Sequence, residues 1–147
     1  MPGHINGVIR GTHGAEPRTI GTVSSCPFCA IDESRIVDSA PLAFAIADGY
    51  PVSQGHTLCI PRRHVADWFD ASDDERAELM ALVSRARDRI RAEHQPDGFN
   101  IGINCGRAAG QTVFHLHVHL IPRYEGDVPD PRGGVRWVKP EQAKYWE

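Results

Sequence analysis

The residues best suited to chemistry form the run His115–Ile121, which reads His-Leu-His-Val-His-Leu-Ile. Alternation of this kind is the period of a β-strand, so it predicts three imidazoles on one face and apolar side chains on the other. A rise of about 3.3 Å per residue sets neighbouring histidine Cα atoms roughly 6.6 Å apart. Because imidazole is both a nucleophile and a metal ligand near neutral pH, the run indicates a catalytic or metal-binding strand.

A second set of candidate ligands is the pair Cys26 and Cys29, which a Pro-Phe dipeptide separates. In a cytosolic chain, this two-residue spacing indicates a metal site or a redox pair more often than a structural disulfide. A redox pair usually lies at the strand-to-helix turn of a βαβ pattern, and no such pattern follows Cys29. Cys59 lies in an apolar run and is expected in the core, whereas Cys105 lies in a glycine-flanked loop.

The composition predicts one ordinary globular domain. The chain has 147 residues, of which 41% are hydrophobic and 24% charged, with a formal net charge of −3. Such a balance disfavours binding to a nucleic-acid polymer, and no run of about 18 apolar residues predicts a membrane span. Residues 1–21 are polar and lack the apolar core of a secretory signal. We therefore expect a cytoplasmic protein that contacts neither a nucleic-acid polymer nor a membrane.

The elements that position these residues are expected between two irregular ends. Residues 1–24 are predicted to be a flexible tail, residues 25–124 the domain, and residues 125–147 an extension that packs on it. The large aromatic side chains of the extension favour burial over disorder. Short apolar or alternating segments bounded by turn residues predict five strands, over residues 36–37, 42–47, 56–60, 99–104 and 113–121.

One long amphipathic helix is predicted between the third and fourth strands. Ser72 and Glu75 have the spacing of a capping box, and the helix should run for about six turns and end before Pro96. With mostly hairpin-like connections, the pattern predicts the α+β class, an antiparallel five-stranded sheet with one long helix and an irregular C-terminal tail. The positions expected to face the core are Leu79, Leu82, Val83, Ala86 and Ile90.

The histidine run, with the preceding Gln-Thr-Val-Phe, resembles the motif of the histidine triad (HIT) family of nucleotide hydrolases and transferases. The resemblance covers about residues 26–124, and every position of the pattern His-apolar-His-apolar-His-apolar-apolar matches. It implies attack by the middle histidine, His117, on a nucleotide α-phosphate, with water hydrolysing the nucleotidyl-histidine intermediate. A neutral imidazole needs only the right tautomer and aim for this, and a carbonyl that accepts the proton of its other nitrogen supplies both.

The resemblance also implies roles for the surrounding residues. His119 and His56 would contact the phosphate or the leaving group, and Asp48 would hold the ribose hydroxyls. From the residues alone, a second interpretation stays open, in which His56 is a histidine at a strand end and Asp48 a turn residue before glycine. Further donors to the phosphate would come from Asn104, Gly110, Gln111 and Thr112.

Similar bacterial members of the family bind zinc through two cysteines, a histidine after an Ile-Pro-basic sequence, and the first triad histidine. The resemblance therefore implies a structural zinc with the ligands Cys26, Cys29, His64 and His115. Two cysteines and two histidines form a closed tetrahedral set. As a metal ligand, His115 could not also contact the phosphate.

The sequence does not identify the leaving group, because it has features of two branches of the family that act on different substrates. The zinc cysteines are typical of the phosphoramidase-like Hint branch, and Gly-Gln-Thr-Val with Ile-Pro-Arg is typical of the Fhit-like dinucleoside polyphosphate hydrolases. A histidine at the third triad position, where transferases have glutamine, favours water as the acceptor. Positive charge for a polyphosphate is available from Arg62, Arg63, Arg107, Arg123, Arg132 and Arg136.

Three functions are compared. The first is a zinc-containing hydrolase acting on an adenosine phosphoramidate or a dinucleoside polyphosphate. The second is a nucleotide-binding module with slow or vestigial catalysis, and the third is a thiol redox protein. The intact triad with Thr112 favours the hydrolase. The family implies a homodimer paired through the helix and the strand at 99–104, and Arg132, Arg136 and Trp137 are candidates for substrate selection by the tail.

Overall fold

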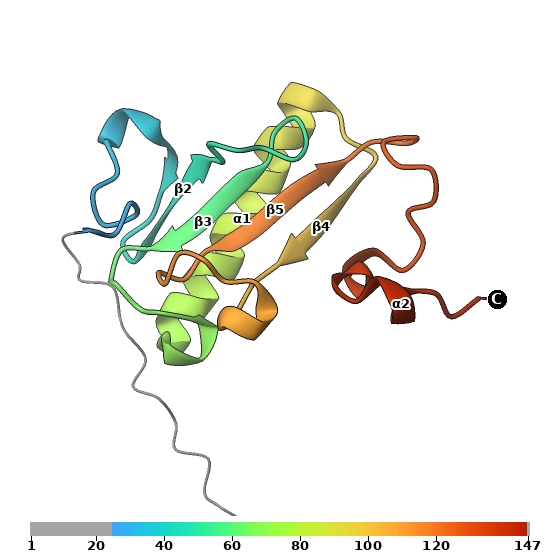
Figure 1. Cartoon of the computed structure of the whole chain (residues 1–147). Helices are drawn as coiled ribbons and strands as arrows, with labels where there is room; N and C mark the ends of the chain where they lie inside the picture. Colours follow the sequence, from blue (N-terminus) through green and yellow to red (C-terminus); the bar gives the residue numbers. More distant parts are fainter. Residues whose placement is uncertain (1–24, 147) are drawn as a thin grey trace, which may run out of the picture.

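The computed structural model describes residues 25–146, and the predicted tail at 1–24 lies outside them. The described chain forms an antiparallel five-stranded sheet with one long helix across its back, as predicted (Figure 1). The strand order is β1-β2-β3-β5-β4, so β4 is an edge strand. The elements are β1 (Ile36–Ser39), β2 (Ala43–Ala47), β3 (Thr57–Pro61), α1 (Asp73–His94), β4 (Gly98–Gly102) and β5 (Val118–Arg123).

The long helix α1 begins with the predicted capping box. The Ser72 hydroxyl accepts from the backbone N–H of Glu75 (3.1 Å), and the Glu75 carboxylate accepts from the N–H of Ser72 (2.8 Å). Arg63 donates two hydrogen bonds of 2.8 Å to the same carboxylate, which lowers the pKa of Glu75 to about 2. The start of α1 is therefore joined to the segment that carries His64.

The sheet has an apolar layer on each face. On the α1 side, the five predicted helix positions pack against Cys59, Leu116, Val118 and Leu120, all of them buried. Each large side chain buried in this way contributes about 1.5–3 kcal/mol. On the opposite face, Phe44, Ile46, Leu58 and Ile60 form a second layer that Phe28 partly covers. This second face carries the histidines, because His119 is paired with Leu58 across β3 and β5.

The last strand differs from its prediction in extent. β5 begins at Val118 rather than Val113, because the N–H of Leu116 donates to the carbonyl of Val65 (2.8 Å), outside the sheet ladder. The alternation itself is confirmed, since Leu116, Val118 and Leu120 all point toward α1. The segment before Val118 bends away from the sheet ladder, so His115 can contact residues outside the sheet.

Residues 125–146, here called the C-terminal arm, extend from β5 beside the edge strand β4 (Figure 1). The arm is less irregular than predicted, because it contains a 3-10 helix, η5 (Gly134–Val138), and the short helix α2 (Pro140–Ala143). The Arg136 guanidinium caps these turns by donating to the carbonyls of Ala143 (2.9 Å) and Gln142 (2.7 Å). Within the described residues, no helix combines the length and apolar character that a membrane crossing requires.

Candidate active site and metal centre

The middle histidine of the run is oriented by its own backbone neighbour. The Nδ1–H of His117 donates to the carbonyl oxygen of His115 at 2.9 Å. This hydrogen bond places the ring proton on Nδ1 and leaves the lone pair on Nε2. The ring is half-buried, and its edge meets the Phe28 ring at a centroid distance of 5.2 Å. His117 thus has the tautomer and the fixed orientation that a nitrogen nucleophile requires.

The other two histidines of this face form a hydrogen-bonded chain. The N–H of Val52 donates to Nδ1 of the buried His56 (3.2 Å), so the His56 proton lies on Nε2. That Nε2–H faces Nδ1 of His119 at 3.0 Å and the Asp48 carboxylate at 3.3 Å. His119 accepts through Nδ1 and therefore carries its own proton on Nε2. This series of hydrogen bonds thus makes Nε2 of His119 a hydrogen-bond donor.

Burial keeps these imidazoles neutral. Desolvation, together with the neighbouring His117 and His56, lowers the pKa of His119 to about 4. Desolvation also lowers the pKa of His56, although the Asp48 carboxylate opposes this shift. At neutral pH, His119 therefore offers a neutral N–H as a donor and adds no positive charge to the site.

Asp48 has both oxygens engaged within the protein. One accepts from the N–H of Tyr50 (2.9 Å), and the other faces His56. Asp48, His56 and His119 have donor atoms within 4.8 Å of one another, which is close enough for a metal ion. However, the Val52 N–H occupies the Nδ1 lone pair of His56 and forces the proton onto Nε2, where a metal would need a lone pair. The geometry favours a proton-carrying chain over a second metal centre.

The loop before the histidines is held by Gln111. Its buried side chain donates to the carbonyls of Ala66 (2.6 Å) and Val113 (3.1 Å) and accepts from the N–H of Gly106 (2.8 Å). Both amide hydrogens are consumed, so Gln111 shapes the loop, and the side-chain donation to phosphate expected from the sequence is not available. Gly110 ends the 3-10 helix η4 (Arg107–Ala109) with a φ of 88°, which favours glycine.

The remaining predicted donors occupy two places. Asn104 is half-buried in the segment that follows β4. Thr112 is exposed and lines a small cavity together with Cys26 and His64. Thr112 therefore lies beside the cysteine–histidine cluster described next.

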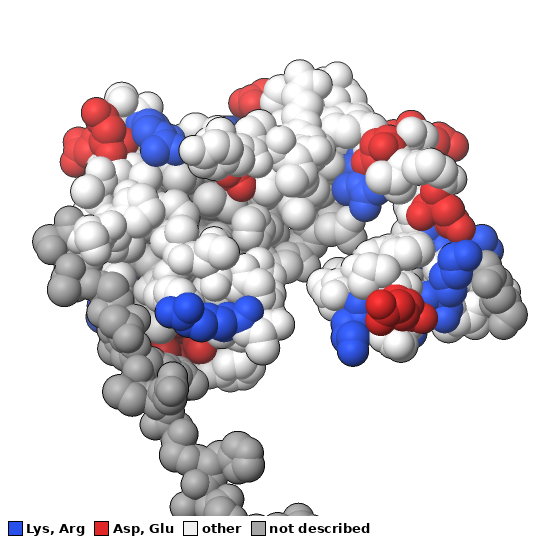
Figure 2. Space-filling model, in the orientation of Figure 1, with Lys and Arg blue, Asp and Glu red and all other residues white. Residues whose placement is uncertain are grey.

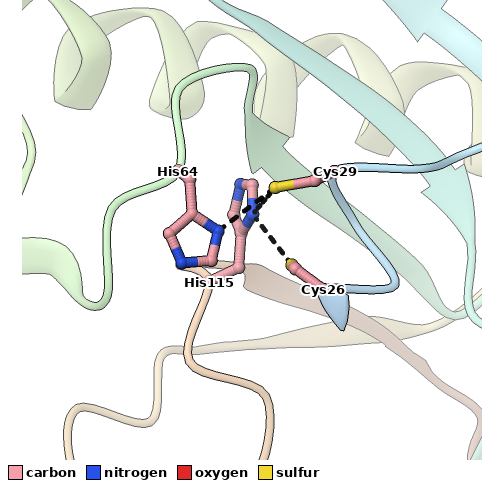
Figure 3. Close-up of side chains that lie close together, drawn as sticks. All are labelled: Cys26, Cys29, His64 and His115. Atoms are coloured by element: carbon pink, nitrogen blue, oxygen red, sulfur yellow. Dashed lines mark hydrogen bonds between the residues drawn. The ribbon is translucent and has the colours of Figure 1, made fainter. Parts of the chain in front are cut away.

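Cys26, Cys29, His64 and His115 converge from three parts of the chain (Figure 3). Their four donor atoms, two Sγ and two Nδ1, all lie within 4.8 Å of one another. Cys29 Sγ is 3.2 Å from His64 Nδ1 and 3.5 Å from His115 Nδ1, and Cys26 Sγ is 3.4 Å from His115 Nδ1. The structure thus brings together the four residues implied as metal ligands.

This donor set fits a tetrahedral zinc ion. Zn–S bonds of about 2.3 Å and Zn–N bonds of about 2.0–2.1 Å place sulfur and nitrogen roughly 3.5 Å apart. Nε2 of the buried His115 bonds the carbonyl oxygen of Pro61 at 2.8 Å, so the ring proton lies on Nε2 and Nδ1 is left as a ligand. All four described cysteines are free, which leaves both thiols available to a metal.

Two contributors to the site were missed from the sequence. Phe28 contacts the rings of both His115 and His117, at centroid distances of 5.9 and 5.2 Å, and so lies between the two sites. Its place between the two cysteines was a usable signal. Val52 acts through its backbone N–H, for which the sequence carries no signal.

Most of the candidate arginines serve the fold. Arg63 pairs with Glu75, Arg123 with Asp127 and Arg132 with Asp130, while Arg107 lies over the ring of Phe114. Arg62 lies over the Phe44 ring and donates to the Ala40 carbonyl. Figure 2 shows charges of both signs around the margin of the face opposite α1 and over the C-terminal arm. None of these contacts points to a polyphosphate.

The chain matches a known protein family and several known proteins. The model of the HIT domain family matches residues 31–126, a range that contains His64 and the histidine run and that Cys26 and Cys29 precede. A Mycobacterium tuberculosis protein named AP-4-A phosphorylase is 39% identical over 102 residues, which cover 69% of this chain and 52% of that protein.

Two solved structures add to this comparison. A hypothetical histidine triad nucleotide-binding protein from Sulfolobus tokodaii is 43% identical with a TM-score of 0.65, covering 71% of this chain and 73% of that one. A zinc-bound histidine triad family protein from Mycobacterium smegmatis is 36% identical with a TM-score of 0.65, covering 80% of this chain and 92% of that one.

Proposed function

The chain belongs to the HIT domain family, and we propose that it is a nucleotide hydrolase that cleaves the bond between a nucleotide α-phosphate and its leaving group. Nε2 of His117 attacks the phosphorus, and the leaving group departs with the electron pair of the broken bond. Water then attacks the nucleotidyl-histidine, releasing a nucleoside monophosphate and restoring the imidazole. Substrates of the adenosine phosphoramidate or dinucleoside polyphosphate type fit this reaction.

The observation that carries this proposal is the hydrogen bond from His117 Nδ1 to the carbonyl of His115. With the ring proton on Nδ1, Nε2 carries the lone pair and needs no separate general base to act as a nucleophile. His119, held by His56 as an Nε2–H donor, is positioned to stabilise the phosphoryl oxygens or the leaving group. Asp48 stays our candidate for the ribose hydroxyls, and Asn104, Thr112 and the amides near Gly110 for the phosphate.

We further propose that Cys26, Cys29, His64 and His115 bind zinc, with the zinc-bound relative as support. All four zinc ligands come from the protein, which makes the site structural. The metal would join the loop at Cys26 to the segment before β5. The carbonyl of His115 also orients His117. By binding the His115 side chain, the metal would therefore fix the carbonyl group that orients the nucleophile.

We also propose that the protein is a homodimer and that it is cytoplasmic. Among residues 25–146, no strand pairs with the outer side of the edge strand β4, and its Ile101 is half exposed, which suits sheet extension by a second copy. Light scattering at micromolar concentration should give twice the chain mass. A monomer under those conditions would contradict the dimer and leave the catalytic assignment untouched.

A substrate panel tests the reaction. Adenosine 5′-phosphoramidate, diadenosine polyphosphates and adenylyl sulfate should be ranked by kcat/KM, and acid-quenched enzyme should be weighed by intact-protein mass spectrometry. We expect turnover of at least one substrate and a covalent species heavier by one adenylyl group. Tight nucleotide binding without turnover or adduct would instead favour the second candidate, a nucleotide-binding module, which the intact triad does not otherwise favour.

A further inference from the structure

A cavity of about 760 Å³ lies between the sheet and the C-terminal arm, within the usual size range of small-molecule sites. We call it the arm cavity. Its walls come from the β2–β3 loop, β4, β5 and the arm. Figure 2 shows the arm standing away from the body of the domain, with a hollow between them.

The arm cavity continues the face that carries the catalytic histidines. Along β5, His119, Ile121 and Arg123 are half-buried on one side, while Val118, Leu120 and Pro122 are buried on the other. Ile121 and Arg123 line the cavity. Since two residues of a strand advance by roughly 6.6 Å, the cavity begins one side chain beyond His119.

The walls of the cavity are preformed. Ser53 donates to the carbonyl of Pro122 (2.7 Å), and Tyr124 donates to the carbonyl of Gln54 (2.8 Å), so the β2–β3 loop is tied to the end of β5. On the arm side, the indole N–H of Trp137 donates to the carbonyl of Arg132 (2.7 Å). Because the indole N–H is bonded to the backbone, the apolar faces of the Trp137 ring can contact a ligand in the cavity.

The charges of the lining are already paired. Arg123 donates two bonds of 2.7 Å to Asp127 and a third of 2.7 Å to Asn100. Asp130 accepts from Arg132 at 2.9 Å. A phosphate would have to displace one of these carboxylates. The rest of the lining is largely apolar and suits an uncharged flat ring, with Val52, Ile121, Val128, Pro131 and Trp137 as its principal members.

The position of the cavity assigns it to one half of the substrate. Asp48, our candidate for the ribose, follows β2, and both β2 and β3 lie on one side of β5. The arm cavity begins at the β2–β3 loop, beyond Asp48, and extends from there across β5 to β4 and the arm. A nucleotide with its sugar at Asp48 and its phosphorus at His117 therefore leaves the arm cavity to the group that departs.

We propose that the arm cavity binds the nucleoside of a leaving nucleoside phosphate, with its base against Trp137, an inference that rests on the proposed hydrolase function. The substrate class is then a dinucleoside polyphosphate. When the bond to the α-phosphorus breaks, the bridging oxygen keeps the electron pair and leaves as the terminal oxygen of a nucleoside polyphosphate. Water supplies the oxygen of the released monophosphate.

Two substrates with the same adenylyl half test the proposal. Diadenosine triphosphate loses ADP and adenosine 5′-phosphoramidate loses ammonia, so only the first needs the arm cavity. Trp137→Ala should lower the ratio of their kcat/KM values about tenfold, as expected for loss of one base–aromatic stack. Trp137→Phe should keep most of the native ratio, and Val128→Trp, which narrows the cavity, should lower the ratio as Trp137→Ala does. Val138→Ala is the matched control, because this exposed neighbour on η5 does not line the cavity.

Other results would overturn the assignment. An equal loss for both substrates, with a change in oligomeric state by light scattering, would make the cavity a subunit contact. An unchanged ratio in Trp137→Ala and Val128→Trp would remove the subsite. If the native protein hydrolyses neither substrate, calorimetry with diadenosine triphosphate and AMP still decides. Trp137→Ala should then weaken binding of the dinucleotide about tenfold more than that of AMP, and equal weakening would refute the subsite independently of catalysis.

Discussion

Replacing His117 with alanine should reduce turnover of the best panel substrate by more than about 1,000-fold, because the variant has no nitrogen to accept the nucleotidyl group. The side chain is half-buried and its hydrogen bond is to a backbone carbonyl, so the fold should persist. Nucleotide affinity, measured by calorimetry with AMP, should change by only a few-fold. The adduct seen by mass spectrometry in the native protein should be absent.

The control for this variant is His94→Ala. His94 lies in the last turn of α1, where its ring is partly exposed and 3.7 Å from the Glu93 carboxylate. We expect turnover close to that of the native protein. His117→Asn, which keeps an N–H for the carbonyl of His115, should be as inactive as His117→Ala. Turnover within tenfold of native in either His117 variant would exclude this residue as the nucleophile.

Loss of the metal centre is the second large effect that we expect. Cys29→Ser should remove zinc and lower the free energy of unfolding by about 3 kcal/mol, since a four-ligand zinc site contributes directly to folding. For a domain of this size, the melting temperature should fall by about 10 °C. Protein purified without added metal should contain one zinc per native chain by elemental analysis, and none in the variant.

Cys105→Ser is the matched control for the metal centre, because Cys105 is a half-buried thiol outside the cluster. It should keep both zinc and melting temperature. Native protein that is free of zinc, or that carries a disulfide between Cys26 and Cys29, would defeat the zinc assignment. Because this test reads metal content and stability, its outcome does not depend on whether the substrate has been found.

The fold was predictable where a local pattern matched the global arrangement. The capping box at Ser72 and the apolar stripe of α1 depend only on residue types at helical spacing, and both are present in the structure. The alternation around Val118 correctly placed the apolar residues toward α1. The start of β5 was not predictable, because the Leu116 N–H bonds a loop carbonyl that only the tertiary fold brings near.

The members of the cysteine–histidine cluster were predictable from the sequence, whereas the contacts of the other candidate residues were less so. The sequence resemblance implied the four residues that meet around the cysteines. It also suggested Gln111 as a phosphate donor, yet its amide hydrogens are used by two backbone carbonyls. Among the tail candidates, Arg132 and Arg136 hold the arm together, and Trp137 alone lines the arm cavity. The type of a side chain determines which hydrogen bonds it can form. The partner that it bonds depends on the packing of the folded chain.

The amide of Val52 has an evolutionary consequence. Every amino acid except proline supplies that N–H, so substitution at position 52 preserves the tautomer of His56 and, through it, that of His119. The same residue's side chain forms part of the arm cavity. For the proposed hydrolase, a substitution at this position would therefore change the shape of the cavity and leave the proton arrangement of the two histidines unchanged, so substrate preference could diverge without a change in the chemistry.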